Sequence, residues 1–174
     1  NKRIPREYLR ASYSQRVELL RGLMDTDGFS GNGSNCEISL SNKELAEDVF
    51  ELISSVGLKT KITPIETSCR ISYRMNFTAY SSTHPIFHLP RKLNSMKSVP
   101  GTRRSESTKK RSIISIEPVP SVPVKCIGVD NNDHTYVVGR SFITTHNSTV
   151  SAIYLLWFAM FNDDKTILIA SNKN

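Results

Sequence analysis

Apolar residues recur at helical spacing over residues 14–26, which predicts an amphipathic helix with its apolar positions at Val17, Leu19, Leu20, Leu23 and Met24. The helix ends in the polar stretch Asp25-Thr26-Asp27-Gly28, where we expect Gly28 to form the left-handed turn that follows many helices. The glycines at Gly31 and Gly33 indicate a flexible loop, and a short strand is expected at Cys36–Leu40.

A second helix is predicted from Ser41 or Asn42 to about Val56, capped by one of these two polar side chains and stopped by Gly57. Its apolar residues lie at Leu45, Val49, Leu52, Ile53 and Val56. Strands are expected next at Lys59–Ile65 and Arg70–Ala79. A turn over residues 81–85 and a short apolar helix or turn reaching about Met96 complete this part of the chain.

Residues 97–112 are rich in Lys, Arg, Ser and Thr, which is typical of a linker. Beyond them the apolar period becomes two and predicts a small β module with strands at Ile113–Ile116, Val122–Val129, Thr135–Val138 and Ser141–Thr144. After Ser148 the pattern predicts a helix over Val150–Asn162 and a buried strand over Thr166–Ala170. The pattern as a whole predicts an α+β chain of three segments.

The charge of the chain is unevenly distributed. Its 174 residues include 23 Lys and Arg against 16 Asp and Glu, a net charge of +7. Residues 1–112 hold 19 of the basic residues and 11 of the acidic ones, so the positive field belongs to the first two thirds. This distribution favours a polyanionic partner, most simply double-stranded DNA, although a merely soluble basic surface explains the charge equally well.

The three cysteines, Cys36, Cys69 and Cys126, are odd in number and lack metal-ligand spacing, so they predict neither a disulfide framework nor a zinc site. A reducing compartment fits this pattern, and we expect a cytoplasmic location in a bacterium or a phage-infected cell. The sequence shows no signal peptide and no apolar run near the ~20 residues of a membrane span, so no membrane partner is expected. Because the chain begins with Asn1 inside a helix-like pattern, we expect it to be a fragment.

Two carboxylates, Asp25 and Asp27, lie where the first predicted helix ends, in the stretch LRGLMDTDG that runs from Leu20 to Gly28. A carboxylate at this place can hold a hard divalent cation beside a phosphate, and Gly22 leaves room for close packing of a second helix. A calcium loop is excluded because its fifth, sixth and twelfth positions hold Phe, Ser and Cys. An ordinary helix with an acidic end is disfavoured because carboxylates are repelled by the negative end of the helix dipole.

This stretch resembles the LAGLIDADG motif of homing endonucleases, specifically a second copy of it. The resemblance implies that residues 1–108 form a half-domain of αββαββα type, in which Asp27 binds Mg²⁺ and Asp25 supports the helix end. It also implies that Lys92, with Arg91 as the alternative, acts on the charge at the scissile phosphate. Asn42 corresponds in the resemblance to a polar residue that positions the attacking water.

Only one such motif is present, whereas cleavage in this family uses two helices that each supply one carboxylate. The chain therefore holds half a site, to be completed by a second copy of itself or by a separate partner.

The predicted strand over residues 70–78 alternates strictly between polar and apolar residues. Its outward set can contact phosphates or base edges in a major groove and comprises Arg70, Ser72, Arg74, Asn76 and Thr78. A solvated sheet face would alternate in the same way, so the strand supports DNA contact only together with the basic charge of this segment.

The sequence Thr145-His146-Asn147-Ser148 places a His-Asn pair directly before a hydroxyl. The side-chain nitrogen of Asn147 can attack its own backbone carbonyl to form a succinimide, while His146 protonates the departing amine and Ser148 offers an oxygen to an acyl group. A polar turn is the plain alternative for these four residues.

The stretches Val124–Val138 and Phe142–Asn147 resemble the two C-terminal sequence blocks of inteins, so residues 109–147 are identified as a splicing segment of the Hint type. The resemblance implies that His146 assists the cyclisation of Asn147, that His134 polarises the same junction, and that Ser148 takes the acyl group. Cys126 is either a branching nucleophile, with which Thr145 is compatible, or a residue that tunes C-terminal cleavage. The alternative for His134 is a surface histidine in a turn.

Splicing of this kind needs no cofactor, but it needs an N-terminal intein block that this chain lacks. The chain is accordingly expected to act with an N-terminal partner fragment, either as half of a split intein or as a truncated part of a continuous one.

Residues 148–174 resemble the region that follows Gly-Lys in the Walker A motif of phage terminase large subunits, which are P-loop ATPases. An unspecified α/β core fragment is the alternative. Because the phosphate loop is absent from the chain, no ATP binding by this fragment is expected.

Together these features predict autocatalytic, single-turnover protein splicing that restores a terminase and carries half of a DNA-cleaving endonuclease. The alternative is a site-specific DNA endonuclease or DNA-binding protein that acts as a dimer through its Gly22-containing helices, with splicing inactive.

Overall fold

The computed structural model describes residues 2–31, 33–66, 70–98, 114–115, 117–120, 122–123, 127–146, 156–158 and 160–161. The chain forms two compact units. The first comprises Asn1–Val119 with Arg140–Phe142, and the second comprises Pro120–Gly139 with Ile143–Asn174. No helix in the described residues has the length and apolar character that crossing a membrane requires.

The first unit opens with two helices, α1 (Arg6–Leu9) and α2 (Tyr13–Thr26). A capping box starts α2, because the Ser12 hydroxyl accepts from the Gln15 backbone N–H while the Gln15 side chain accepts from the Ser12 backbone N–H at 3.1 Å. The helix predicted from periodicity over residues 14–26 is confirmed within one residue at its start.

The third helix, α3 (Lys43–Ser55), starts and stops where the sequence predicts. Asn42 caps its beginning, and its side-chain oxygen accepts from the Leu45 N–H at 2.8 Å. Gly57 ends the helix with a φ of +87°, and the N–H groups of Gly57 and Leu58 donate to carbonyls of the last turn, at Ser54 and Ile53. These two bonds form a Schellman motif, which requires the left-handed conformation that glycine adopts readily.

Four antiparallel strands form one sheet in the order β1-β2-β4-β3, with bounds β1 Gly28–Ser30, β2 Asn35–Leu40, β3 Ile62–Glu66 and β4 Ile71–Thr78. A short helix, α4 (Pro90–Leu93), follows. From α2 onwards the order is α-β-β-α-β-β-α, so the predicted α+β class and the predicted half-domain order are both confirmed. The apolar pattern alone did not reveal β1, which the structure forms directly after Asp27.

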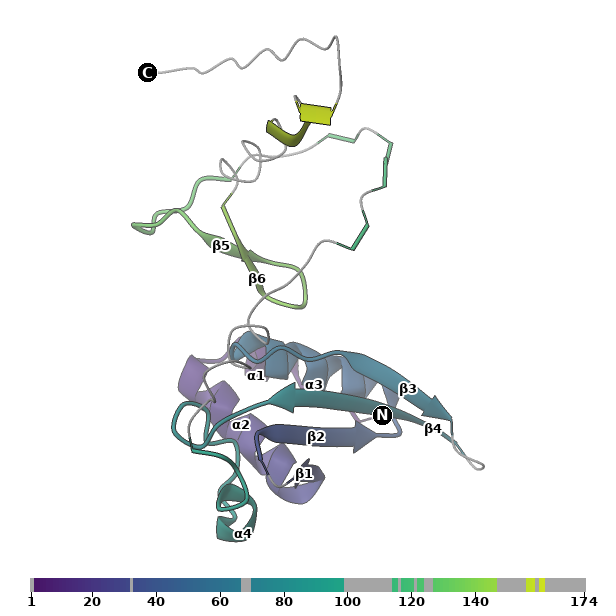
Figure 1. The fold of residues 1–174 in the computed structure, drawn as a ribbon, viewed down its shortest axis with the longest axis vertical. Coiled ribbons are helices and arrows are strands. Elements are labelled where there is room, and N and C mark those ends of the chain that lie inside the picture. The colour runs from purple at the N-terminus through teal and green to yellow at the C-terminus, as the bar shows by residue number, and fades with distance from the viewer. Residues whose placement is uncertain are drawn as a thin grey trace. The chain divides into compact units, whose positions relative to one another are not determined.

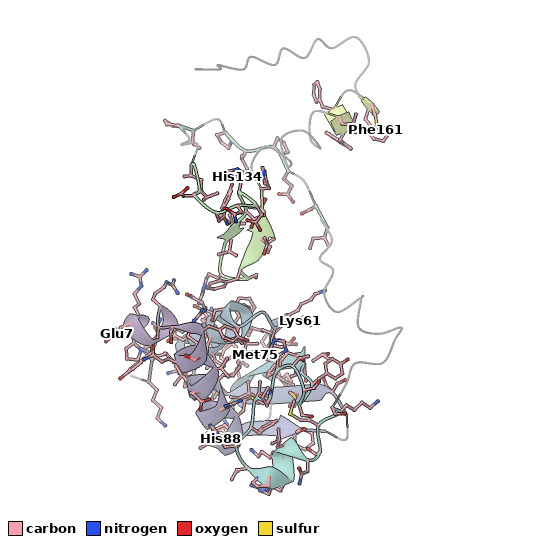
Figure 2. All side chains as sticks on the ribbon, turned by 90° about the vertical axis from the view of Figure 1, so that its left-hand side faces the viewer. Glu7, Lys61, Met75, His88, His134 and Phe161 are labelled. Carbon is pink, nitrogen blue, oxygen red and sulfur yellow. The ribbon has the colours of Figure 1, made fainter. Side chains whose placement is uncertain are left out.

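The helices cover one face of this sheet, as Figure 1 shows for α2 and α3. The inward side chains of the two central strands are almost fully buried and comprise Cys36, Ile38, Met75 and Phe77. In Figure 2, Met75 lies between the helices and the strands. Burial raises the pKa of the Cys36 thiol to about 12, so this cysteine is a packing residue.

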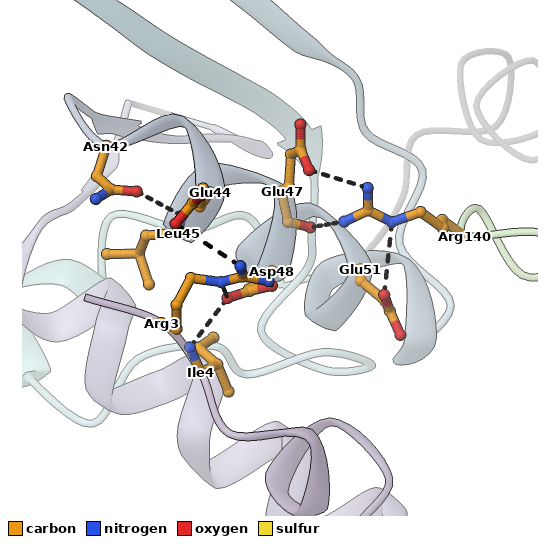
Figure 3. Close-up of polar contacts among 9 residues, drawn as sticks. All are labelled: Arg3, Ile4, Asn42, Glu44, Leu45, Glu47, Asp48, Glu51 and Arg140. Atoms are coloured by element: carbon orange, nitrogen blue, oxygen red, sulfur yellow. Dashed lines mark hydrogen bonds and ion pairs between the residues drawn. The ribbon is translucent and has the colours of Figure 1, made fainter. Parts of the chain in front are cut away.

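An ion pair fastens the start of the chain to α3 (Figure 3). The guanidinium of Arg3 donates to both carboxylate oxygens of Asp48, at 2.6 and 2.8 Å, and the Ile4 N–H donates to the same carboxylate at 3.0 Å. The Asp48 side chain is only 4% exposed, so its charge depends on these three donors. On the exposed side of the same helix, Arg140 lies 3.2 Å from the Glu47 carboxylate.

The second unit contains a hairpin of β5 (Tyr136–Val138) and β6 (Ile143–Thr145). Both strands were predicted, and a turn at Asn131-Asn132-Asp133 precedes them. The predicted strands at 113–116 and 122–129 are not formed by the residues described there. Residues 156–158 and 160–161 are helical, as expected, whereas the strand predicted at 166–170 lies outside the described residues.

Replacing Asp48 with alanine is expected to lower the free energy of unfolding by about 2 kcal/mol at neutral pH, because Arg3 and the Ile4 N–H lose a buried acceptor. The Arg3 hydrogen bond holds the pKa of the Asp48 carboxyl below its usual range. The contribution of Asp48 to the free energy of unfolding is therefore present above the pKa of the unfolded state, about 3.9, and is lost as the pH falls through the pKa of the folded state.

Urea unfolding across this pH range measures the effect. Glu44→Ala is the matched control, because Glu44 lies 3.7 Å from Arg3 and both side chains are half exposed. It should cost less than about 0.5 kcal/mol. Equal losses in the two variants would show that the buried carboxylate is not the anchor.

Candidate functional site

The acidic motif lies where α2 gives way to β1. Asp27 is the C-cap residue of α2, and its exposed carboxylate lies beside the Thr26 hydroxyl at 3.4 Å. Gly28 follows in β1, but not in the left-handed conformation that the sequence led us to expect. A Cβ at Gly28 would lie 2.6–2.7 Å from side-chain and backbone atoms of Met24, so glycine is required there by close packing.

Asp25 binds a segment that is distant in the sequence. Its carboxylate accepts from the backbone N–H groups of His88, at 3.1 Å, and Leu89, at 3.2 Å. The His88 ring in turn lies 2.8 Å from the Glu18 carboxylate on α2. Asp25 thus fastens the residues before α4 to the last turn of α2, and the prediction that it supports the helix end agrees with this placement.

Lys92, on α4, lies at the same helix end. Its ammonium donates to the backbone carbonyls of Met24 (2.8 Å), Asp25 (2.9 Å) and Gly28 (2.6 Å), and it lies 5.6 Å from the centroid of the Phe87 ring. Burial lowers the pKa of Lys92, and the neighbouring Arg91 adds to the effect, while Asp25 and Asp27 oppose it. The structure thus places Lys92 beside Asp27, with its donors directed at the backbone.

Asn42, predicted to position a water, is engaged as the N-cap of α3. The oxygen that accepts from Leu45 is therefore occupied by a structural bond. A role toward water stays a prediction for this residue.

The outer face of the sheet carries four of the five polar residues predicted for this strand, whereas Arg70 lies just before β4 begins. The pairing places Glu37 opposite Asn76 and Ser39 opposite Arg74, so these side chains share one face. The Arg74 guanidinium lies 3.0 Å from the Glu37 carboxylate, and the hydroxyls of Ser39 and Ser72 are 2.6 Å apart. Thr78 and Asn35 form the next pair along the same face.

Glu37, which lies on β2, was not predicted as part of this face. The alternation of β2 was the available signal, since Cys36 and Ile38 point inward and Glu37 between them must point outward.

The second unit brings two of the predicted splicing residues together. The rings of His134 and His146 meet edge to face, with their centroids 6.3 Å apart at 89°. His134 has a φ of +50°, and its Nδ1 lies 3.3 Å from the Val129 carbonyl oxygen. The Nδ1 atom of His146 is buried and has no hydrogen-bond partner among the described residues.

Thr145, the residue before His146, is paired with Tyr136 at the end of the hairpin. Asn147, Ser148 and Cys126 lie outside the described residues.

The described residues of the first unit offer few candidate metal ligands. No group of three or more His, Cys, Asp or Glu side chains that could hold a metal ion occurs in the described part of the chain. Magnesium is commonly bound by one or two carboxylates together with phosphate oxygens and water. The exposed carboxylate of Asp27 fits such a site only if DNA and a second domain supply the remaining ligands.

Comparison with known proteins supports the first part of this interpretation. Residues 14–84 match the LAGLIDADG-like domain family. This match covers α2 to the turn after β4, and it supports the assignment of the first segment as half of a homing endonuclease.

Two mycobacterial proteins share sequence with the chain. It is 40% identical over 162 residues to the replicative DNA helicase DnaB of Mycobacterium intracellulare, an alignment that covers 89% of this chain and 27% of that protein. It is 46% identical over 43 residues to the replicative DNA helicase DnaB of Mycobacterium leprae (strain TN), covering 25% of the chain and 7% of that protein. The alignments thus span only about a quarter of the length of the first relative and a smaller share of the second.

The similarities also correct the expected host. The sequence after Ser148 was interpreted as a terminase fragment, whereas the relatives are replicative helicases. Both kinds of protein are motors that act on DNA, and a short apolar helix followed by a buried strand does not distinguish one from the other.

Proposed function

We propose that the chain is the C-terminal part of an intein that interrupts a replicative helicase, and that it breaks its own backbone between Asn147 and Ser148. The observation that carries the proposal is the His134–His146 contact, with a buried ring nitrogen of His146 that has no partner in the described part of the chain and precedes Asn147 in the sequence. The helicase relatives support the choice of host.

The chemistry follows from the residue types. The side-chain nitrogen of Asn147 attacks its own backbone carbonyl carbon, and the C–N bond to Ser148 breaks as the succinimide closes. His146 gives its proton to the departing amine, and the attacking amide loses one proton to solvent or a base. An Nδ1 proton on His134, donated to the Val129 carbonyl, would leave the other nitrogen of that ring to exchange protons near the junction.

Ligation requires a second fragment. Ser148 would accept an acyl group from an N-terminal intein partner by transesterification, which exchanges one ester or thioester for an ester on its hydroxyl. Neither this step nor the cyclisation requires a metal ion.

Mass spectrometry of the chain, alone and with an N-terminal fragment of the related helicase intein, tests this proposal. We expect loss of the 27 residues from Ser148 onwards, or their transfer to the partner. Asn147→Ala should abolish both products, and His146→Ala should slow them by about 10²–10⁴-fold, the usual contribution of a general acid. Tyr136→Phe, on the hairpin of the same unit, controls for a general structural effect of substitution in the second unit. An intact wild-type chain with the matched partner would count against splicing.

We further infer that the first unit binds duplex DNA with the outer face of its sheet and cleaves it when a second LAGLIDADG-like domain is present. The supporting observations are the polar outer face of β2 and β4, the net positive charge of this segment and the exposed carboxylate of Asp27. Mg²⁺ held by Asp27 would stabilise the charge that develops at the phosphate. Gly22 lies on the exposed side of α2, where an added Cβ would meet no atom within 4 Å in the described chain.

The Arg74–Glu37 pair yields a test of DNA binding. Glu37→Gln removes the carboxylate that neutralises Arg74, so the affinity for duplex DNA should rise and the slope of log affinity against log salt should steepen by about one. Arg74→Ala should weaken binding about tenfold. Fluorescence anisotropy at several salt concentrations measures both quantities.

The matched control is Glu7→Gln, which removes one negative charge on the helical side of the unit (Figure 2). It should leave the slope unchanged. A sheet that does not contact DNA would give the same slope in all four proteins.

A further inference from the structure

All three ammonium donors of Lys92 are used in hydrogen bonds at the end of α2. An ammonium group has three N–H donors, and the three acceptors of Lys92 are the carbonyls of Met24, Asp25 and Gly28. Two of these oxygens belong to the last turn of α2, where the Met24 carbonyl also accepts from the Asp27 N–H, and the third belongs to the first residue of β1. One cation therefore joins the helix to the strand across Asp27.

The opposite connection is made by Asp25, whose carboxylate accepts from the N–H groups of His88 and Leu89. Residues 88–92 and 24–28 thus bind each other by complementary charges at two places, with a carboxylate at one and an ammonium at the other. Gly28 allows Met24 to lie so close that any Cβ would collide. The backbone on both sides of Asp27 is held by contacts that do not involve its own carboxylate.

We propose that Lys92 is a positioning residue, which fixes the backbone at Asp27 and so sets where that carboxylate meets its metal ion and phosphate, and that it does not contact DNA phosphate itself. This proposal rests on the proposed DNA-cleaving role of Asp27. It differs from the role that resemblance implies for a lysine at this place, because the observed donors already have acceptors.

The experiment separates backbone anchoring from phosphate contact. In the full chain without DNA or metal, Lys92→Met keeps a long, unbranched side chain at this place but removes the three charge-assisted hydrogen bonds. The amides of residues 26–28 should then exchange their hydrogens at least about tenfold faster, measured by NMR. Arg91→Met removes the same charge from the preceding residue, which is exposed, and should leave that exchange unchanged.

Salt-dependent binding to duplex DNA, in the absence of divalent metal, provides the second readout. Anchoring predicts the wild-type slope for Lys92→Met, whereas loss of a phosphate contact would reduce the slope by about 0.9. Lys92→Arg keeps the charge, but its planar fork does not converge on three carbonyls. Anchoring predicts faster exchange in that variant as well, with an unchanged slope, and the variant provides the test if Lys92→Met fails to fold.

Wild-type exchange rates in both Lys92 variants, or a slope reduced by about one in Lys92→Met, would overturn the proposal. Titration of the wild type with Mn²⁺, followed by broadening of the Asp27 amide resonance, tests the metal site separately. A wild-type chain that binds neither DNA nor Mn²⁺ would refute the role of Asp27, while the exchange rates would still decide whether Lys92 anchors the turn.

Discussion

The negative charge at the end of α2 is the constraint on which the first unit depends. A helix already carries about half a negative charge at its C-terminus, and here Asp25 and Asp27 add two carboxylates where the last turn has no basic residue. The compensation comes from the segment around α4, which supplies the Lys92 ammonium to the carbonyls and two backbone N–H groups to Asp25. In an isolated helix these carboxylates would be repelled by the negative helix end, but here the same residues form the junction between α2, β1 and α4.

This junction determines which surfaces are available for function. Because α2 and α3 cover one face of the sheet (Figure 1), the polar residues of β2 and β4 are left on the opposite face. Asp27 lies outside the core and is exposed, while the backbone on either side of it is held by hydrogen bonds from Lys92. For the metal-binding role proposed for Asp27, this support would hold the carboxylate in place by bonds that metal binding does not break.

The sequence predicted best those elements that are specified locally. Periodicity located α2 and α3, and the caps at Asn42 and Gly57 follow from preferences that extend over only a few residues. The three-residue strand β1 is too short to show alternation, and Gly28 resembles a helix-ending glycine although it is needed for packing against Met24. The contacts of Asp25 and Lys92 join residues more than 60 positions apart, so no local pattern could reveal them.

The two proposed activities place different demands on the chain. Cyclisation of Asn147 uses an amide, a carbonyl and imidazole protons, all within one stretch of sequence, so a small hairpin that brings His134 to His146 is sufficient support. Cleavage of DNA requires a carboxylate held at a fixed place, a metal ion and a second domain, so its support must come from distant segments of the fold. Loss of the Lys92 bonds would accordingly impair the second activity while leaving the atoms that perform the first untouched.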